Sequence, residues 1–145
     1  MEINLTMTNQ SISPLFQKID CVRLPVTDLD AALAFYRDRL GLRLIWRTEI
    51  AAGLAMPDTD AEIVLYTDGS AQEIDLLVAS ADEAAAEFKL AGGTVVVPPF
   101  DIQIGRCVVV RDPWGNPLVL LDMSKGKLVT DSEGKILGNT KNTTG

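Results

Sequence analysis

The chain has 145 residues, 47% of them hydrophobic, and its 20 acidic and 13 basic residues give a net charge of −7. This length and composition suit one domain with a substantial core. The acidic balance argues against nucleic acid as a partner, because phosphate binding needs a basic surface, and it suits either solubility or a cationic ligand.

The two cysteines, Cys21 and Cys107, are too few for a disulfide framework. The polar N-terminus lacks the apolar segment of a signal peptide. No apolar run approaches the ~20 residues that cross a bilayer. We therefore expect a protein of the reducing cytoplasm with no membrane partner.

The first predicted unit follows an N-terminal extension, residues 1–17, whose apolar Ile12, Leu15 and Phe16 could pack against a neighbouring subunit. A strand is expected at residues 19–26. Thr27 and Asp28 are then candidate N-caps of a helix that ends at Gly41. Helical spacing predicts that its buried face carries Leu29, Leu33, Tyr36 and Leu40.

A second unit repeats this plan, with a strand at residues 72–79 and a capping box formed by Ser80 and Glu83. The expected buried stripe of its helix, which ends at Gly92 and Gly93, comprises Ala81, Ala84, Ala85, Phe88 and Ala91. Three strand-like runs follow each helix, at 42–50, 51–57 and 61–67 and then at 93–99, 104–112 and 116–122. Residues 98–101 are expected to form a loop.

The two units superpose when the chain is shifted by 52 residues. The shift places Val26 on Val78, Asp30 on Asp82, Tyr36 on Phe88 and Gly41 on Gly93. Such internal repetition is strong evidence for a fold built from two copies of one unit. We predict an α+β fold of two βαβββ modules, residues 18–69 and 70–122, which form a curved mixed sheet, a cup with helices outside. The C-terminal extension, residues 123–145, contains a possible hairpin.

Three stretches carry a family resemblance: "LPVTDLDAALAFYRDRLGL", "DEAAAEFKLAGG" and "VVVRDPWGNPLVLLD". Over about residues 19–122 the chain resembles the vicinal-oxygen-chelate superfamily, which includes glyoxalase I, bleomycin-resistance proteins and extradiol dioxygenases. The resemblance implies a cup that holds a divalent ion in the metalloenzyme members, with ligands from the first and last strand of each module.

The four positions that the resemblance implies for metal ligands are occupied by Cys21, Val64, Glu73 and Val119. The two valines cannot coordinate a metal, and a thiolate with one carboxylate is a poor site for hard ions. The chain contains no histidine. We therefore expect no metal and no other cofactor.

Strand alternation predicts which side chains face the cup. The expected ligand-binding residues are Cys21, Arg23, Glu62, Val64, Tyr66, Glu73, Asp75, Val119 and Leu121, with Phe100 and Trp114 near the mouth. Arg23 could instead pair with Asp75, its repeat-related partner. Cys21 and Cys107 are expected to be buried filler rather than nucleophiles.

Two functions follow, with a vestigial cup as a third reading. The first is a metal-independent protein that binds or sequesters a drug-like or metabolite ligand and forms a homodimer, as bleomycin-resistance-like members do. The second is a glyoxalase-like lyase or isomerase in which Glu73 is the base and Arg23 stabilises an anion. Alternatively, Glu73 has no catalytic role and is an exposed carboxylate at the start of a strand.

Overall fold

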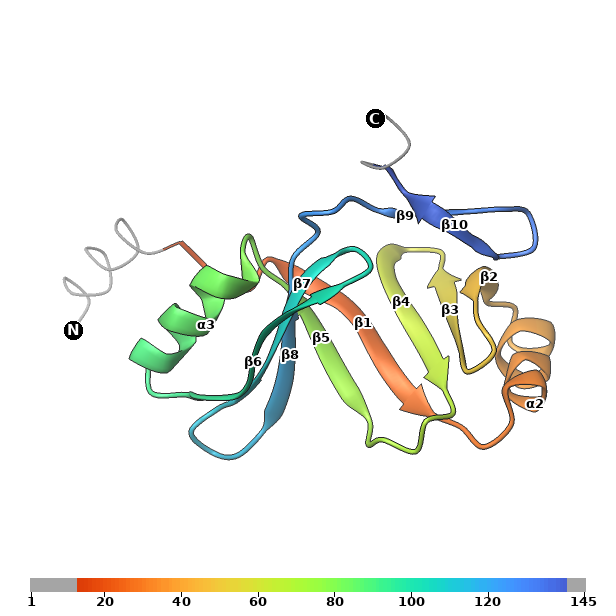
Figure 1. Cartoon of the computed structure of the whole chain (residues 1–145). Coiled ribbons are helices and arrows are strands. Elements are labelled where there is room, and N and C mark those ends of the chain that lie inside the picture. The colour runs from red at the N-terminus through yellow and green to blue at the C-terminus, as the bar shows by residue number, and fades with distance from the viewer. Residues whose placement is uncertain (1–12, 141–145) are drawn as a thin grey trace.

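The computed structural model describes residues 13–140, so Ile12 and the ends of both extensions lie outside the described residues. Two modules of similar plan follow one another along the chain (Figure 1). The first consists of β1 (Lys18–Pro25), α2 (Leu29–Leu33), a π-helical segment (Ala34–Arg39), β2 (Arg43–Arg47), β3 (Ala51–Met56) and β4 (Thr59–Tyr66). The second consists of β5 (Glu73–Leu77), α3 (Ala81–Leu90), β6 (Thr94–Ile102), β7 (Gly105–Arg111) and β8 (Pro117–Leu121).

The strands of both modules join in one eight-stranded mixed sheet, in the order β2-β3-β4-β1-β5-β8-β7-β6. β1 runs parallel to β4 and β5 runs parallel to β8, while β1 and β5 pair antiparallel at the centre. The predicted α+β fold of two βαβββ modules is therefore confirmed. Val22 pairs with Ile74, which is 52 residues, one repeat length, away in sequence, so a pseudo-twofold axis passes through this pair.

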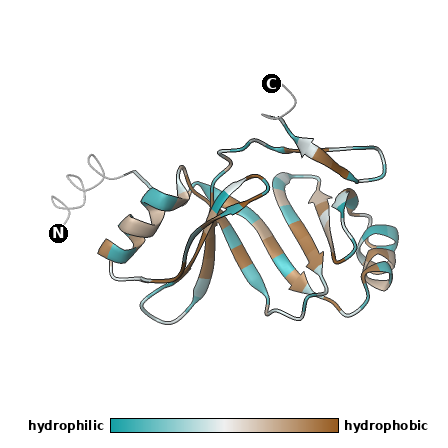
Figure 2. Ribbon diagram, viewed as in Figure 1, coloured by the Kyte–Doolittle hydropathy of each residue, from teal (hydrophilic) through white to brown (hydrophobic). Residues whose placement is uncertain are grey.

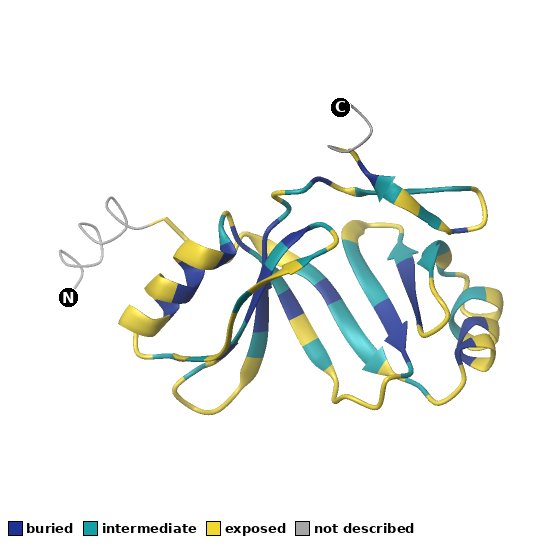
Figure 3. Cartoon of the chain, viewed as in Figure 1, coloured by how far each residue is buried: buried dark blue, intermediate teal, exposed yellow. Residues whose placement is uncertain are grey.

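Each module buries a core between its helix and the outer face of the sheet (Figures 2 and 3). Against α2, Leu29 and Leu33 pack on Leu54 and Leu65. The core against α3 comprises Val78, Ala81, Ala84, Ala85, Phe88, Val108, Val110 and Leu120. Burying one such leucine or phenylalanine stabilises the fold by about 1.5–3 kcal/mol. Because these cores lie on the helix side of the sheet, the concave face is not needed for them.

The helix starts are the predicted ones. Asp28 Oδ1 accepts a hydrogen bond from Ala31 N at 3.1 Å, and Ser80 Oγ accepts one from Glu83 N at 3.2 Å. These bonds satisfy backbone donors that have no partner inside the helix.

The predicted buried face of the first helix is wrong at its end, because Leu40 is 57% exposed. The helix widens after Leu33, and Leu40 N donates to Phe35 O five residues back. A π turn rotates each residue through a smaller angle than an α turn, so the 3.6-residue spacing no longer applies. In the second helix Ala91 is also exposed, since it follows the last helical residue.

The loop predicted at residues 98–101 is also wrong, because β6 continues through it to Ile102. Its register shifts between Val97 and Phe100, where Pro98 and Pro99 lie. β6 is the last strand of the sheet. A proline lacks a ladder donor, and an edge strand tolerates that loss.

Beyond the modules, β9 (Leu128–Thr130) and β10 (Ile136–Asn139) form an antiparallel hairpin. The hairpin lies over the ends of the first module's strands (Figure 1). Arg47 N donates to Gly134 O at 2.8 Å, which fixes the hairpin to β2. At its other end, the buried Asn139 side chain hydrogen-bonds Gln103 and the Lys125 carbonyl, so the hairpin also holds the second module.

Candidate functional site

The concave face of the sheet contains a cavity of about 400 Å³ that both modules and the C-terminal segment line. Six of the predicted site residues line it: Cys21, Arg23, Glu62, Val64, Asp75 and Leu121. Ten other residues also line it, namely Lys18, Asp20, Ile45, Trp46, Asp60, Ile102, Ile104, Met123, Lys127 and Leu128. This size and a mainly apolar wall are typical of small-molecule sites.

Cys21 lies at the centre of this cavity floor. It pairs with Glu62 of β4 on one side and with Asp75 of β5 on the other. Its thiol donates a hydrogen bond to Asp75 Oδ2 at 3.3 Å. Burial, followed by the nearby Asp75 charge, raises the pKa of Cys21 well above its usual range. The thiol therefore stays protonated, as expected for filler rather than for a nucleophile.

Asp75 is the most deeply buried acid of the site, with 7% of its surface exposed. Burial, with the neighbouring Glu73, raises the pKa of Asp75 to about 8. Its Oδ1 receives no hydrogen bond from any donor in residues 13–140. The carboxyl is therefore largely neutral near pH 7.

Arg23 pairs with Glu73 and not with Asp75, which corrects the alternative drawn from the repeat. The distance from Arg23 Nη1 to Glu73 Oε2 is 3.5 Å. The pseudo-twofold axis passes through Val22 and Ile74, so the next residue along β1, Arg23, lies opposite the preceding residue of β5, Glu73. The guanidinium carbon also lies 4.5 Å from the centre of the Tyr66 ring, a cation–π contact.

Glu62 meets the edge of Trp46, whose Nε1 donates to Glu62 Oε1 at 2.7 Å. Burial raises the pKa of Glu62 despite this hydrogen bond. The indole reaches Glu62 across Gly53, where a Cβ atom would lie 2.0 Å from Trp46 Nε1. The absent side chain at Gly53 thus makes room for this contact.

Asp20 enters the cavity because β1 contains a register shift between Ile19 and Cys21. A bulge places an extra residue on one strand and breaks strict alternation, which is why alternation did not predict Asp20 at the site. Burial raises the pKa of Asp20. Lys18 and Asp60, both at the more exposed rim, form an ion pair.

Five predicted ligand-binding residues do not line the cavity: Tyr66, Glu73, Phe100, Trp114 and Val119. Tyr66 is buried beneath Arg23, and Val119 packs with Cys107 and Leu121 in a cluster on the second module. Trp114 is 85% exposed in the turn between β7 and β8. Lys127 and Leu128 were missed because they follow the repeat and no motif marks them.

The four positions that the resemblance implies for a metal do not fit one. Val64 and Val119 carry no donor atom, the Cys21 thiol is protonated, and Glu73 is paired with Arg23. Within residues 13–140, no three histidine, cysteine, aspartate or glutamate side chains are grouped so as to hold a metal ion.

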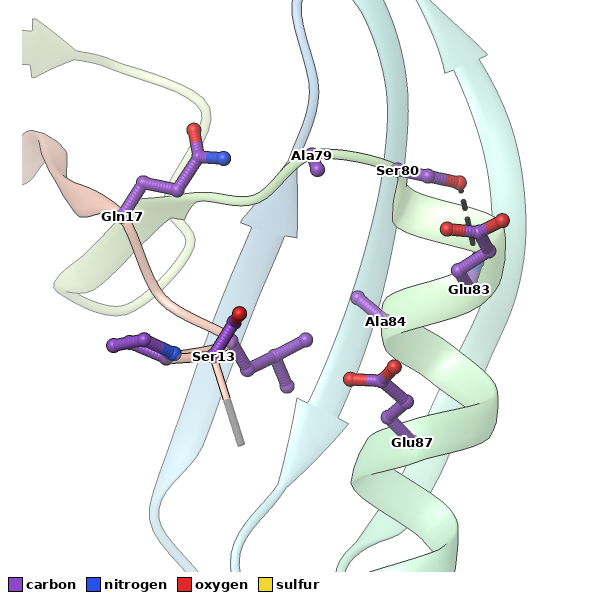
Figure 4. A pocket seen from close by; sticks show the side chains of 9 residues that line it. Ser13, Gln17, Ala79, Ser80, Glu83, Ala84 and Glu87 are labelled. Carbon is purple, nitrogen blue, oxygen red and sulfur yellow. Dashed lines mark hydrogen bonds between the residues drawn. The ribbon is translucent and has the colours of Figure 1, made fainter. Parts of the chain in front are cut away.

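A second hollow, of about 560 Å³, lies on the helix side between residues 13–17 and α3 (Figure 4). Glu83 and Glu87 point into it from α3, and Ser13 and Gln17 lie opposite (Figure 4). It contains none of the predicted site residues. The acidic side chains in this hollow belong to the solvated face of an amphipathic helix.

Comparisons with known proteins agree with the geometry. The model of the Glyoxalase/Bleomycin resistance protein/Dioxygenase superfamily matches residues 18–120. Methylmalonyl-CoA epimerase from Mycobacterium tuberculosis is similar in structure, with a TM-score of 0.66, 22% identity, and coverage of 78% of this chain and 92% of the epimerase. A variant of homoprotocatechuate 2,3-dioxygenase from B. fuscum is also similar, with a TM-score of 0.59 and 25% sequence identity. The match covers 77% of this chain and 33% of the dioxygenase.

No curated protein matches the sequence significantly. Among the described residues, no helix has the length and apolar character needed to cross a membrane.

Proposed function

The chain belongs to the Glyoxalase/Bleomycin resistance protein/Dioxygenase superfamily, and we propose that within it this protein binds a small molecule in its cup without a metal ion. The observation that carries the proposal is the cavity floor. Of the positions where a metal centre would need ionised donors, Cys21 carries a protonated thiol and Val64 has no donor atom, and the buried Asp75 beside Cys21 has a raised pKa. Apolar walls and a few polar groups suit the binding of an organic ligand.

Two accompanying features belong to the same proposal. A cytoplasmic location is in keeping with the free thiols of Cys21 and Cys107. A homodimer is in keeping with Ile19 and Ile74, which are half-exposed on the outer face of the paired strands β1 and β5.

Ligand release tests the binding function. Protein purified without chelator is denatured, and the released small molecules are identified by mass spectrometry while metals are measured on the same sample. We expect a stoichiometric organic molecule and no stoichiometric metal. Val64→Phe, which fills the cavity, should abolish the organic signal, whereas the exposed Leu137→Phe should not. Stoichiometric metal, or a ligand retained by a folded Val64→Phe protein, would overturn the proposal.

The second candidate is a lyase or isomerase, favoured by the raised pKa of Asp75. A carboxyl that titrates near neutral pH can donate or accept a proton in a reaction. Glu73, held by Arg23 next to Asp75 but outside the residues that line the cavity, would be the base, and Asp75, which lines it, the acid. Incubating the protein with its released ligand in D₂O distinguishes the two functions. An enzyme incorporates deuterium and Glu73→Gln abolishes the incorporation without loss of binding, whereas a binding protein incorporates none.

A further inference from the structure

Three carboxyl groups converge on the cavity floor from adjacent strands. Asp20 comes from β1, Glu62 from β4 and Asp75 from β5, and all three line the cavity. Their hydrogen-bond donors are neutral: Trp46 donates to Glu62 and the Cys21 thiol donates to Asp75. The other neighbour of Asp75 is a further acid, Glu73. Within residues 13–140, no lysine or arginine nitrogen lies within 4.0 Å of any of the three.

The nearest cations of the cup are already engaged. Lys18 pairs with Asp60 at the rim, and Lys127, which also lines the cavity, acts on the same carboxylate. Arg23 pairs with Glu73 and stacks on Tyr66. The floor therefore carries acidic groups in excess. A buried charge without a countercharge is unfavourable, so an anionic ligand would add to the imbalance and a cation would relieve it.

Asp75 adds an independent observation that points to a ligand. It is more than nine-tenths buried, it lines the cavity, and its Oδ1 accepts no hydrogen bond from the described chain. An unsatisfied buried acceptor of this kind lowers the stability of the fold. A donor supplied by a ligand would remove the deficit.

The remaining walls describe the other part of the ligand. Ile45, Val64, Ile104, Leu121, Met123 and Leu128 surround the floor with apolar surface. The indole of Trp46 lies beside Glu62. A ligand with a charged head and an apolar or aromatic body would match both parts, since aromatic rings favour cations and flat apolar groups.

We propose that the cup takes an organic cation, an amine or quaternary ammonium with an apolar body, whose head lies against Asp20, Glu62 and Asp75. This inference rests on the proposed binding function and gives it a ligand class. Burial raises the pKa of all three carboxyls, and a bound cation would reverse that effect by stabilising their charged forms.

A fluorescence titration with four probes that share a phenyl ring and differ in charge tests the charge preference. The chain has two tryptophans, so Trp114→Phe, a change at an exposed turn, leaves Trp46 in the cavity as the only reporter. The probes are benzylamine, benzyltrimethylammonium, benzyl alcohol and benzoate at low salt. We expect both cations to bind at least about tenfold more tightly than benzyl alcohol, and benzoate to bind most weakly.

Variants then assign the preference to the floor. Asp75→Asn and Glu62→Gln should each weaken cation binding by about tenfold or more and leave benzyl alcohol unchanged. Asp20→Asn is a further variant if either of these fails to fold. Glu87→Gln, on the outer face, removes the same charge and should change nothing. Asp75→Asn should weaken benzylamine more than benzyltrimethylammonium, because the single amide oxygen of asparagine must serve both the Cys21 thiol and the amine, and only benzylamine needs an acceptor.

The outcomes separate this inference from the function beneath it. If benzyl alcohol or benzoate binds as tightly as the cations, the cation preference is overturned while binding in the cup stands. If Glu87→Gln weakens binding as much as Asp75→Asn does, the effect is one of net charge and the assignment to the floor is overturned. If no probe binds, the inference fails, and the mass-spectrometric test of released ligand decides the proposed function independently.

Discussion

The Cys21 thiol donates a hydrogen bond to Asp75 Oδ2 across the central strand pair, with Sγ and the oxygen 3.3 Å apart. The two side chains replace what would be a ligand position and its neighbour in a metal-binding cup. Burial raises the pKa of both groups, and Asp75 raises that of Cys21 further, whereas the hydrogen bond from the thiol partly lowers the pKa of Asp75. Both groups should therefore respond to pH in a way that can be measured.

The stability of the protein should decrease as the pH rises from about 4 to 8. The pKa of Asp75 is 3.8 when unfolded and about 8 when folded, so between these values the folded chain holds an additional proton. The stabilisation is complete below the unfolded pKa and is lost as the pH rises through the folded one, by up to about 1.4 kcal/mol per pH unit.

Urea unfolding of the native chain and of Asp75→Asn between pH 4.5 and 8.5 measures this effect. The variant should lose most of the slope, with a shallower one remaining from Asp20 and Glu62, whose pKa values are also raised by burial. Parallel profiles for the two proteins would show that Asp75 is ionised throughout.

Neither cysteine should react with Ellman's reagent in the folded protein at pH 8. Burial raises the pKa of Cys107 to about 12 and that of Cys21 further, and the thiolate is the reacting form. Both should react at once in denaturant. Cys21→Ala and Cys107→Ala identify the source of any folded-state reaction, and labelling at the rate of a free thiol would contradict the assignment.

Gly53→Ala should destabilise the protein by about 1–3 kcal/mol and shift the emission of Trp46. The new methyl group would lie 2.0 Å from Trp46 Nε1 and 2.6 Å from Glu62 Oε1, so the indole must leave Glu62. A double-mutant cycle with Trp46→Ala isolates the cause. In that background the cost of the alanine should shrink, and an unchanged cost would place the strain in the backbone instead.

Truncation after Gly126 should leave a folded sheet with weaker ligand binding. The removed segment contributes Lys127 and Leu128 to the cavity and joins both modules through Gly134 and Asn139.

Asn139→Ala alone should lower the free energy of unfolding by about 1–3 kcal/mol, because its buried partners lose their hydrogen bonds. Leu137→Ala, at an exposed position of the same hairpin, is the control. Equal effects of the two substitutions on unfolding would rule out the anchoring role of Asn139.

The fold could be predicted because its signals are local and occur twice. Asp28 and Ser80 cap helices with regular apolar spacing, and the 52-residue shift joins them into one plan. The site was predictable only where regular geometry persists, as at Cys21, Glu62 and Asp75. Asp20 enters through a bulge, Leu40 leaves the core through a π turn, and Leu128 arrives from a segment outside the repeat. The bulge, the π turn and the position of the C-terminal segment leave no mark in the spacing of apolar residues, so the sequence pattern could not predict them.

The pseudo-twofold axis through Val22 and Ile74 has a consequence for how the two halves recognise each other. Under this symmetry Cys21 is equivalent to Glu73, and Arg23 to Asp75, yet the actual pairs are Arg23 with Glu73 and Cys21 with Asp75. Two copies of the first half would set Arg23 against an uncharged thiol twice. Two copies of the second half would bring four carboxyl groups together. Each half is thus complementary to the other and not to itself, so the central strand pair favours one first half beside one second half over two copies of either.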